Sequence, residues 1–398
     1  LYAAYFGSLL AVMSLVKAHG VFLFTGILVF YGGMAICAET KDVRNRTVLA
    51  AAIFAMAFLA ARMLLGYWTA GPAAAWPFGS AYTPLLADMT FARWVKLIWP
   101  VAYSLYLQLL GIALLFSTPL CAVILCCGLK PGHMLRRAAW LTVAVLSVHV
   151  VIVACFTATI AGASALETID RVHFRYYSFV FPLLFVLAAG FLTVQLPRTD
   201  AGRSRLALVA AFGALLALAA WRLPLEYKAN FVDSPELASL AGGRRPFYLL
   251  VGLSAAALAA FAWRPKLGIA TYLFVFAPLA VATSGFHALQ LQRHHVLANE
   301  PIDRSGRLAR LYLEAEVART IVIGSDGPQV FRVLFQLDSP GAQAHFAEPG
   351  AAIPLSALPS DRTTAIVVGE HQLSFEATSI LSTARMSVVR LPPREPAR

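Results

Sequence analysis

The sequence predicts an all-α, polytopic membrane domain of about nine transmembrane helices, followed by a small C-terminal α/β soluble domain. Composition is the first reason: of 398 residues, 59% are hydrophobic and only 13% are charged, whereas about a quarter of an ordinary globular domain is charged. The second reason is that apolar runs recur over residues 1–286, after which charged residues become frequent. The predicted domains are therefore residues 1–286 and 287–398.

The predicted membrane spans are runs of apolar residues, because a helix needs about 20 of them to cross the core of a bilayer. A helix also satisfies its own backbone hydrogen bonds in lipid, where no water is present. The spans occupy residues 1–16, 20–38, 47–68, 98–127, 138–162, 177–196, 206–222, 247–263 and 268–286.

Alternate loops differ in positive charge, and this difference predicts how the chain is oriented. The four short, strongly cationic loops carry Lys41, Arg44 and Arg46; Lys130, Arg136 and Arg137; Arg198, Arg203 and Arg205; and Arg264 and Lys266. The positive-inside rule places these loops in the cytoplasm. The longer loops at 69–97, 163–176 and 223–246 then face outward, as does the chain after Phe286. Anchoring loops explain the formal charge of +12, so we expect membrane lipids rather than nucleic acid as partners.

The tail has the pattern of a small α/β domain behind a polar linker. Thr320–Gly324 and Thr364–Gly369 are β-branched runs that end in glycine, which is typical of strands. The spacing predicts helices over 304–318 and Val330–Leu337, and a short strand over Gln343–Phe346. The glycine-containing turn after the first strand lacks the spacing of a phosphate-binding motif, so we interpret it as a plain strand-to-helix connection.

One outward loop concentrates the side chains that suit phosphate binding. Arg171, His173, Arg175, Tyr176 and Tyr177 lie within seven residues at the start of a span, at the depth of the lipid headgroups. The arginine fork suits bidentate recognition of phosphate, and tyrosine hydroxyls add donors. An aromatic belt with one anchoring arginine is the competing interpretation, but anchoring arginines belong mainly to cytoplasmic loops. We therefore predict a substrate-binding site here.

Three further residues are weaker candidates for a substrate or catalytic role. Arg62 lies within the third span. Its side chain has either a functional role or extends to the lipid headgroups as an anchor. Lys17 lies in a turn near the outer side and can reach a lipid phosphate. Asp88, with Glu167 and Asp170, supplies carboxylates that can face the outer side, so Asp88 is the candidate for a catalytic base, although an exposed loop carboxylate is the commoner interpretation.

The pattern as a whole resembles one enzyme superfamily. Many spans, long outer loops, Arg175-Tyr176-Tyr177 leading into a helix that carries Pro182-Leu-Leu, and a small outward C-terminal domain resemble the GT-C superfamily of glycosyltransferases. These enzymes use polyprenyl-phosphate sugars, and the resemblance is to the bacterial mannosyl- and aminoarabinosyltransferase branch. The chain opens with Leu1 inside an apolar stretch, so we expect it to be truncated at its N-terminus.

The resemblance implies an inverting transfer of a sugar from a polyprenyl-phosphate donor to a glycan, lipid or protein acceptor. The reaction would take place at the outer face of a bacterial inner membrane, with a periplasmic C-terminal domain. Arg171, Arg175 and Tyr176 would hold the phosphate of the donor. The acidic catalytic motif of the family lies in its first outer loop, which we expect upstream of Leu1. Some members use a divalent metal, but the sequence shows no ligand cluster and no evident cofactor.

A transporter or flippase of lipid-linked or other anionic substrates is the alternative. Such proteins tend to have inverted repeats and paired polar residues near the middle of the bilayer. In this sequence the polar residues of interest lie mainly at the outer edge of the spans. The sequence therefore favours the glycosyltransferase over the transporter.

Overall fold

The computed structural model describes residues 1–16, 19–72, 90–130, 132–162, 168–194, 201–227, 232–240 and 243–393. The chain divides into two compact units, Leu1–Leu289 and Gln290–Arg398. This division lies close to the boundary after residue 286 that the change in composition predicts. We describe each unit by itself.

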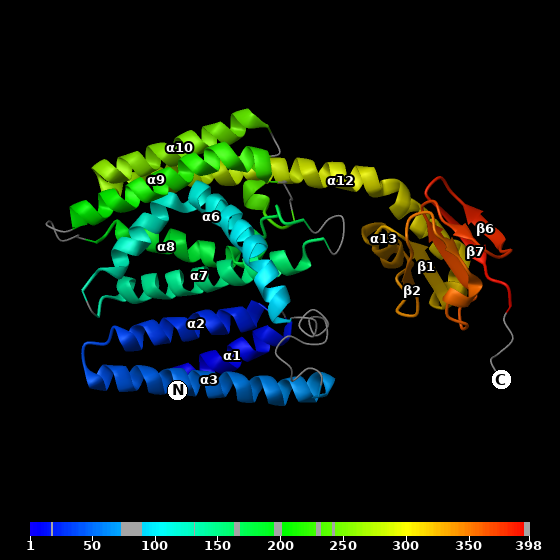
Figure 1. The fold of residues 1–398 in the computed structure, drawn as a ribbon, viewed down its shortest axis with the longest axis horizontal. Helices are drawn as coiled ribbons and strands as arrows, with labels where there is room; N and C mark the ends of the chain where they lie inside the picture. Colours follow the sequence, from blue (N-terminus) through cyan, green and yellow to red (C-terminus); the bar gives the residue numbers. More distant parts are fainter. Residues whose placement is uncertain are drawn as a thin grey trace. The chain divides into compact units, whose positions relative to one another are not determined.

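The described part of the first unit is helical (Figure 1). It contains α1 (Tyr2–Val16), α2 (His19–Ile36), α3 (Lys41–Ala70), α6 (Phe91–Cys127), α7 (Met134–Ile160), η1 (Phe174–Tyr176), η2 (Ser178–Val180), α8 (Phe181–Phe191), α9 (Ala201–Glu226), η3 (Pro235–Leu240), α10 (Arg244–Trp263), α11 (Pro265–Thr271), the π-helical segment η4 (Tyr272–Phe276) and the first part of α12 (Ala277–Leu313).

Six of the described helices are long and apolar enough to cross a membrane: Lys41–Thr69, Phe91–Cys127, Met134–Ile160, Gly202–Glu226, Arg244–Trp263 and Pro265–Arg319. Three shorter apolar helices, Tyr2–Val16, Gly20–Ile36 and Ser178–Phe191, coincide with the other predicted spans. The chain thus has the fold of a multi-pass helical membrane protein, as predicted. The total of nine spans stays a prediction.

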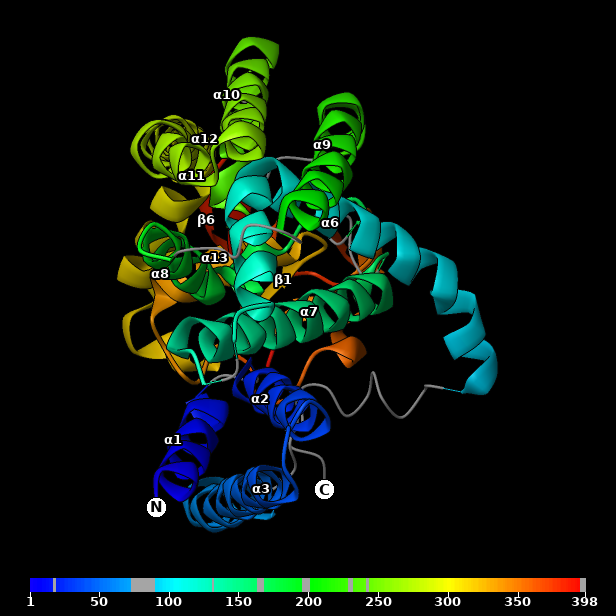
Figure 2. The same cartoon turned by 90° about the vertical axis from the view of Figure 1, so that its left-hand side faces the viewer.

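Helices α1, α2 and α3 pack together as a three-helix group, side by side in both Figure 1 and Figure 2. Leu10, Phe54 and Phe58 are buried in its core. The close contact of α1 with α3 requires a residue without a side chain, since a Cβ at Gly7 would lie 2.4 Å from the carbonyl oxygen of Phe54. Helix α7 packs against α2 and joins this group to the rest of the unit.

The main core of the first unit lies among α6, α7, α8, α9, α10 and α11. Helix α6 is bent within it, because Phe116 has non-helical backbone angles (φ −129°, ψ 15°) and Pro119 follows three residues later. A proline inside a helix cannot donate the usual backbone hydrogen bond and pushes the preceding turn aside. The bend brings Phe116 against Phe181 at the start of α8, with ring centroids 4.3 Å apart.

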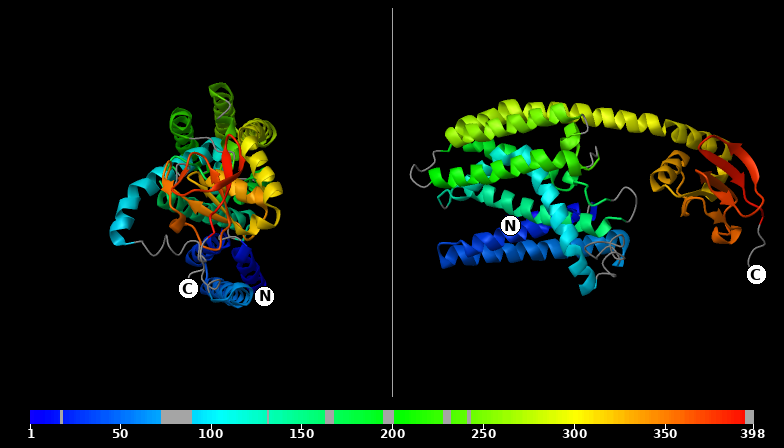
Figure 3. Two further views of the ribbon diagram at one scale, coloured as in Figure 1. Left: turned by 90° about the vertical axis from the view of Figure 1, so that its right-hand side faces the viewer. Right: turned by 45° about the horizontal axis from the view of Figure 1, so that its top comes forward.

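The second unit contains a five-stranded sheet, seen from orange to red in Figure 3, with strand order β2-β1-β4-β7-β6. Strands β2, β1 and β4 are parallel, whereas β7 runs antiparallel to both β4 and β6. The elements of this unit are the end of α12, η5 (Glu314–Arg319), β1 (Thr320–Gly324), α13 (Gly327–Leu337), β2 (Gln343–Phe346), β3 (Ala352–Ile353), η6 (Leu355–Ala357), β4 (Thr364–Val368), β5 (Gln372–Leu373), β6 (Thr378–Ser382) and β7 (Met386–Arg390).

Each face of this sheet has its own core, as the alternation of side chains along a strand requires. Val322 and Ile366 face α13 and the end of α12. Ile321 and Ile323, from the same strand as Val322, pack on the opposite side against the segment that contains Ile353. The sheet is therefore covered on both faces, which explains why β1 and β4 are uninterrupted apolar runs.

The predicted β1, α13, β2 and β4 are all confirmed, and the small α/β domain is of the predicted kind. The prediction of a polar linker after residue 286 is wrong, because α12 continues as one helix to Leu313. Its polar residues are those of an exposed helix, and Ile302, Ala309 and Leu313 anchor its end to the core of the second unit. Strands β6 and β7 were not foreseen, since polar residues interrupt their apolar residues.

Candidate functional site

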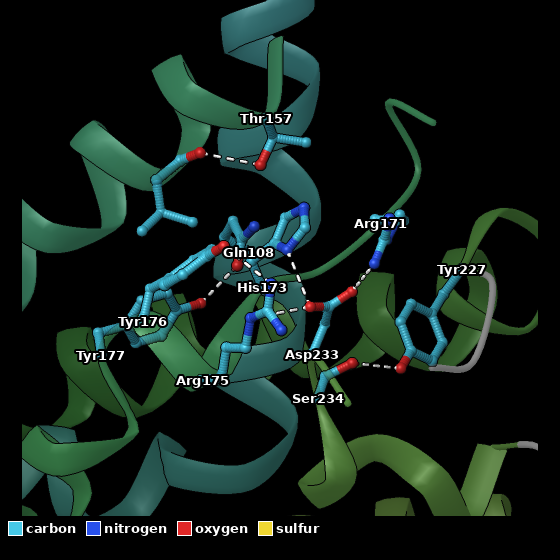
Figure 4. Close-up of polar contacts among 11 residues, drawn as sticks. Gln108, Thr157, Arg171, His173, Arg175, Tyr176, Tyr177, Tyr227, Asp233 and Ser234 are labelled. Atoms are coloured by element: carbon cyan, nitrogen blue, oxygen red, sulfur yellow. Dashed lines mark hydrogen bonds and ion pairs between the residues drawn. The ribbon is translucent and has the colours of Figure 1, made fainter. Parts of the chain in front are cut away.

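The predicted phosphate-binding loop converges on one buried carboxylate, that of Asp233. Arg171, His173 and Arg175 precede α8, and Asp233 lies in the segment between α9 and η3 (Figure 4). The Arg171 guanidinium pairs with Asp233 Oδ2, and Arg175 Nε forms an ion pair with Asp233 Oδ1, 3.0 Å away. His173 Nδ1 lies 3.4 Å from the same Oδ1. We call Arg171, His173, Arg175, Tyr176 and Asp233 the Asp233 cluster.

Local backbone geometry presents these side chains on one side of the loop. Val172 and Phe174 alternate with the cluster residues and are buried in the main core. The backbone N–H of Arg175 donates to the carbonyl oxygen of Asp233 over 2.8 Å, so the two segments are joined by main chain as well as by ion pairs. Phe174 packs against α6 at Gly111, where a Cβ would come within 2.7 Å of its ring. The core therefore positions the loop, and the ion pairs fix its polar face.

The electrostatics of the cluster keep Asp233 ionised. Burial by itself raises the pKa of Asp233, but the hydrogen bond and charge of His173, together with Arg171 and Arg175, outweigh it and hold the pKa below its usual range. The two guanidiniums exceed the charge of Asp233 by one. An anion at the open edge of the cluster would be attracted by this excess positive charge. The attraction is stronger there than in water, because the dielectric constant is lower.

The open edge of the cluster is formed by Arg175 and Tyr176. The side chain of Arg175 is 39% exposed, compared with 11% for Arg171 and 1% for His173. The Arg175 guanidinium lies over the Tyr176 ring, 4.8 Å from its centroid, and its Nη2 donates to the Tyr176 hydroxyl over 2.9 Å. This arrangement orients both side chains toward the same exposed position. They are the two predicted residues best placed to touch a ligand.

Tyr177 and His173 do not fit the direct binding role that the sequence predicts for them. Tyr177 is fully buried and donates to Gln108 of α6, so its hydroxyl belongs to the core. His173 is buried as well and faces Asp233 and the ring of Tyr176, whose centroid is 5.5 Å away. Both residues position the loop. In a short irregular segment, the side chains of consecutive residues point in different directions. The residue types alone do not reveal which of them are buried.

Of the three weaker candidates, the structure describes Arg62. Arg62 is only 5% exposed, and its Nη1 donates to the Ser14 hydroxyl over 2.5 Å, which joins α3 to α1. This contact favours a structural role over snorkelling or substrate binding. Lys17, Asp88 and Glu167 lie outside the residues that the structure describes.

Asp233 is the residue that sequence reasoning missed. The only outer-side carboxylates considered were Asp88, Glu167 and Asp170, although the outward loop at 223–246 also contains Asp233 and Glu236. A signal was present, since Asp233-Ser-Pro235-Glu236 places two carboxylates close together in a predicted outward loop. What the sequence could not show is that a segment about 60 residues from the arginines lies against them; the ion pair joins positions 171 and 233.

The end of α9 adds polar side chains beside the cluster. The hydroxyls of Tyr227 and Ser234 form a hydrogen bond, which joins α9 to the Asp233 segment (Figure 4). One residue earlier, Glu226 pairs with Arg222 over 2.9 Å and accepts a hydrogen bond from the Tyr103 hydroxyl. A second group of polar side chains therefore lies next to the cluster.

No group of three His, Cys, Asp or Glu side chains that could hold a metal ion occurs among the described residues. The carboxylate of Asp233 is occupied by its arginine partners. The described residues of the cluster therefore do not form a donor set that fits a metal ion.

Comparison with known proteins finds no match: neither a protein family, nor a curated protein, nor a solved structure matches this chain.

Proposed function

We propose that this chain is part of an integral membrane glycosyltransferase of the bacterial inner membrane that uses a polyprenyl-phosphate sugar as donor. The observation that carries the proposal is the Asp233 cluster, in which Arg175 and Tyr176 are held together at an exposed edge. A phosphate bound there would accept hydrogen bonds from a guanidinium whose position is already set. Pre-set donors stabilise developing negative charge without reorganising.

The transfer that this site would support is an inverting substitution. The hydroxyl oxygen of the acceptor forms a bond to the anomeric carbon, the bond from that carbon to the phosphate oxygen breaks, and the polyprenyl phosphate leaves with the electron pair. The proton of the hydroxyl passes to a general base. Arg175 and Tyr176 would act on the leaving phosphate, and Arg171 and His173 would position them through Asp233.

A direct test measures phosphate binding in the full chain reconstituted in nanodiscs. Farnesyl phosphate is the probe, and farnesol serves as the ligand without phosphate. Arg175→Ala should weaken binding of farnesyl phosphate about tenfold or more, because a hydrogen bond to a charged group contributes about 1.5–3 kcal/mol, while farnesol binding stays unchanged. Transfer of labelled sugar from a polyprenyl-phosphate donor should be abolished.

The matched control is Arg264→Ala. Arg264 also stacks on an aromatic neighbour, Trp263, with its guanidinium 4.7 Å from the ring centroid, but it lies in a predicted cytoplasmic loop. Unchanged sugar transfer by Arg175→Ala, or an equal loss of transfer in both variants, would contradict the assignment of the phosphate site. A transporter or flippase would instead move the lipid-linked sugar across the membrane without releasing free polyprenyl phosphate, so measuring that product separates the two classes.

A further inference from the structure

A cavity of about 260 Å³ lies inside the first unit, among α6, α8, η3, η4 and the start of α12. Aromatic rings dominate its wall: Phe116, Phe181, Phe185, Tyr272 and Phe276 all line it. One ionisable carboxyl group, that of Glu236, also lines it. The cavity is distinct from the Asp233 cluster, because none of the five cluster residues lines it.

The aromatic wall is continuous. The centroid of the Phe116 ring lies 4.3 Å from that of Phe181 and 6.0 Å from that of Phe185. On the other side, the Tyr272 ring lies 5.9 Å from Phe185 and 5.3 Å from Phe276. The faces of such rings carry partial negative charge and attract cations. Five aromatic rings that can attract a cation therefore line this cavity.

Two irregular helical segments form this wall. Phe116 lies at the bend of α6, and Tyr272 and Phe276 are the first and last residues of the π-helical segment η4. A π-bulge inserts an extra residue into a helical turn, costs stability, and is frequent at functional sites. Regular helices would place these rings differently. The cavity therefore depends on both the bend of α6 and the π-helical segment η4.

Glu236 places a carboxyl group in this largely apolar space. Its Oε2 is buried and has no hydrogen-bond partner among the described residues, and no Lys, Arg or His of that part of the chain lines the cavity. The backbone holds the residue in place, since the Ser284 hydroxyl donates to the Glu236 carbonyl oxygen over 2.6 Å. A buried polar group without a partner is unfavourable, and a ligand with a positive charge would remove that cost.

We propose that this cavity binds an organic ammonium ion with apolar substituents, with Glu236 as its counterion and the aromatic rings as its cage. An alkyl or isoprenoid chain could use the apolar wall but would leave the carboxyl group desolvated. A metal cation would gain little, because Glu236, Ser284 and Tyr272 are the only described lining residues with side-chain oxygens. The combination of aromatic faces with one carboxylate is the chemistry that recognises quaternary ammonium groups.

The test uses benzyltrimethylammonium as the probe and the full chain in nanodiscs, with binding measured by equilibrium dialysis of the labelled ion. The unchanged protein should bind the probe saturably, and Glu236→Gln, which keeps the shape of the side chain, should weaken binding about tenfold or more. Phe276→Leu should weaken it less. Glu316→Gln, which removes an exposed carboxylate of the second unit, is the matched control and should bind as the unchanged protein does.

A pH series on the unchanged protein keeps the proposal testable if Glu236→Gln does not fold. Burial raises the pKa of Glu236, and the quaternary probe itself does not titrate. Among the described residues, the other titratable groups that face Glu236 are the hydroxyls of Tyr272, which lines the cavity, and of Tyr177. Affinity should therefore fall as the pH is lowered from 8 to 4.5. Equal affinity throughout, or equal binding by Glu236→Gln, would overturn the proposal.

Discussion

At the scale of single residues, Asp233 decides the geometry of the site. A carboxylate that is removed from water is unfavourable unless ion pairs and hydrogen bonds compensate it, and here Arg171, His173 and Arg175 do so from one short loop. Because each partner depends on the same carboxylate, the four side chains form a coupled group. Replacing Asp233 would remove the carboxylate that both arginines share.

Asp233→Asn should therefore destabilise the protein strongly, since breaking a buried ion pair on one side costs about 3–5 kcal/mol. Thermal unfolding in detergent, followed by circular dichroism, measures the effect. Asp42→Asn is the control, because Asp42 forms an exposed ion pair with Arg46 within α3, and such pairs contribute about 0.3–0.5 kcal/mol. Equal melting temperatures for the two variants would contradict the central role of Asp233.

The same carboxylate predicts how stability depends on pH. The pKa of Asp233 lies below its ordinary value of 3.8, so the folded state binds its proton less readily than the unfolded state does. Its stabilising contribution is fully present above that ordinary value and is lost as the pH falls through the lower, folded-state pKa. The difference in melting temperature between the unchanged protein and Asp233→Asn should therefore shrink below about pH 4. A constant difference down to pH 2 would contradict this assignment.

At the scale of elements, apolar length predicts where a helix lies but not how neighbouring helices pack. The segments predicted as spans are helical, yet the bend of α6 at Phe116 and the π-helical segment η4 were not predicted. Pro119 was visible in the sequence, whereas nothing in residues 272–276 signals a π-bulge. Such departures arise when the packing of whole helices outweighs the preference of each residue for regular α-helix.

Gly268 illustrates a packing requirement between two elements. A Cβ at this position of α11 would lie 2.3 Å from the backbone nitrogen of Phe261 in α10, and backbone atoms cannot move aside cheaply. Gly268→Ala should destabilise the protein by about 1–3 kcal/mol, measured as a lower melting temperature. Gly252→Ala in α10 is the matched control, because a Cβ there meets nothing within 4 Å. An unchanged melting temperature for Gly268→Ala would show that α10 and α11 do not pack this closely.

At the scale of the whole molecule, the two units have separate hydrophobic cores. The cores of the second unit draw only on residues from Ile302 onward, and those of the first unit end at Ala280. The end of α12 belongs to the second unit, because Ile302, Ala309 and Leu313 lie in its core. The sequence showed the change in composition but not that one helix continues through it.

The fragment 290–398 should fold by itself in water. We expect it to give mixed α/β circular dichroism and a cooperative thermal transition. The fragment 314–398, which lacks the α12 residues of the core, should melt at a lower temperature or not fold, since a large buried aliphatic side chain contributes about 2–5 kcal/mol. A non-cooperative transition in 290–398, or equal stability of the two fragments, would contradict the independence of this unit.

Reporter fusions test the orientation that the charge of the loops predicts. Alkaline phosphatase is active only on the outer side of the inner membrane. Green fluorescent protein fused in the same way is fluorescent only on the cytoplasmic side. A fusion after Lys130 should be fluorescent and inactive as a phosphatase, and a fusion after Arg398 should show the reverse. The opposite result at both positions would invert the topology and move the Asp233 cluster to the cytoplasmic side.

The sequence by itself predicted which part of the chain is suited to lipid and which part is suited to water. The apolar runs and their helical form, the helices and strands predicted in the tail, and the grouping of Arg171, Arg175 and Tyr176 follow from local composition and spacing. Only the tertiary structure decided which of these side chains reach the surface, because Tyr177 and His173 are buried while Arg175 is exposed. It alone joined Asp233 to the arginines and lined a cavity with five aromatic rings and Glu236. Local patterns report the environment of a segment, whereas contacts between distant segments depend on how whole helices pack.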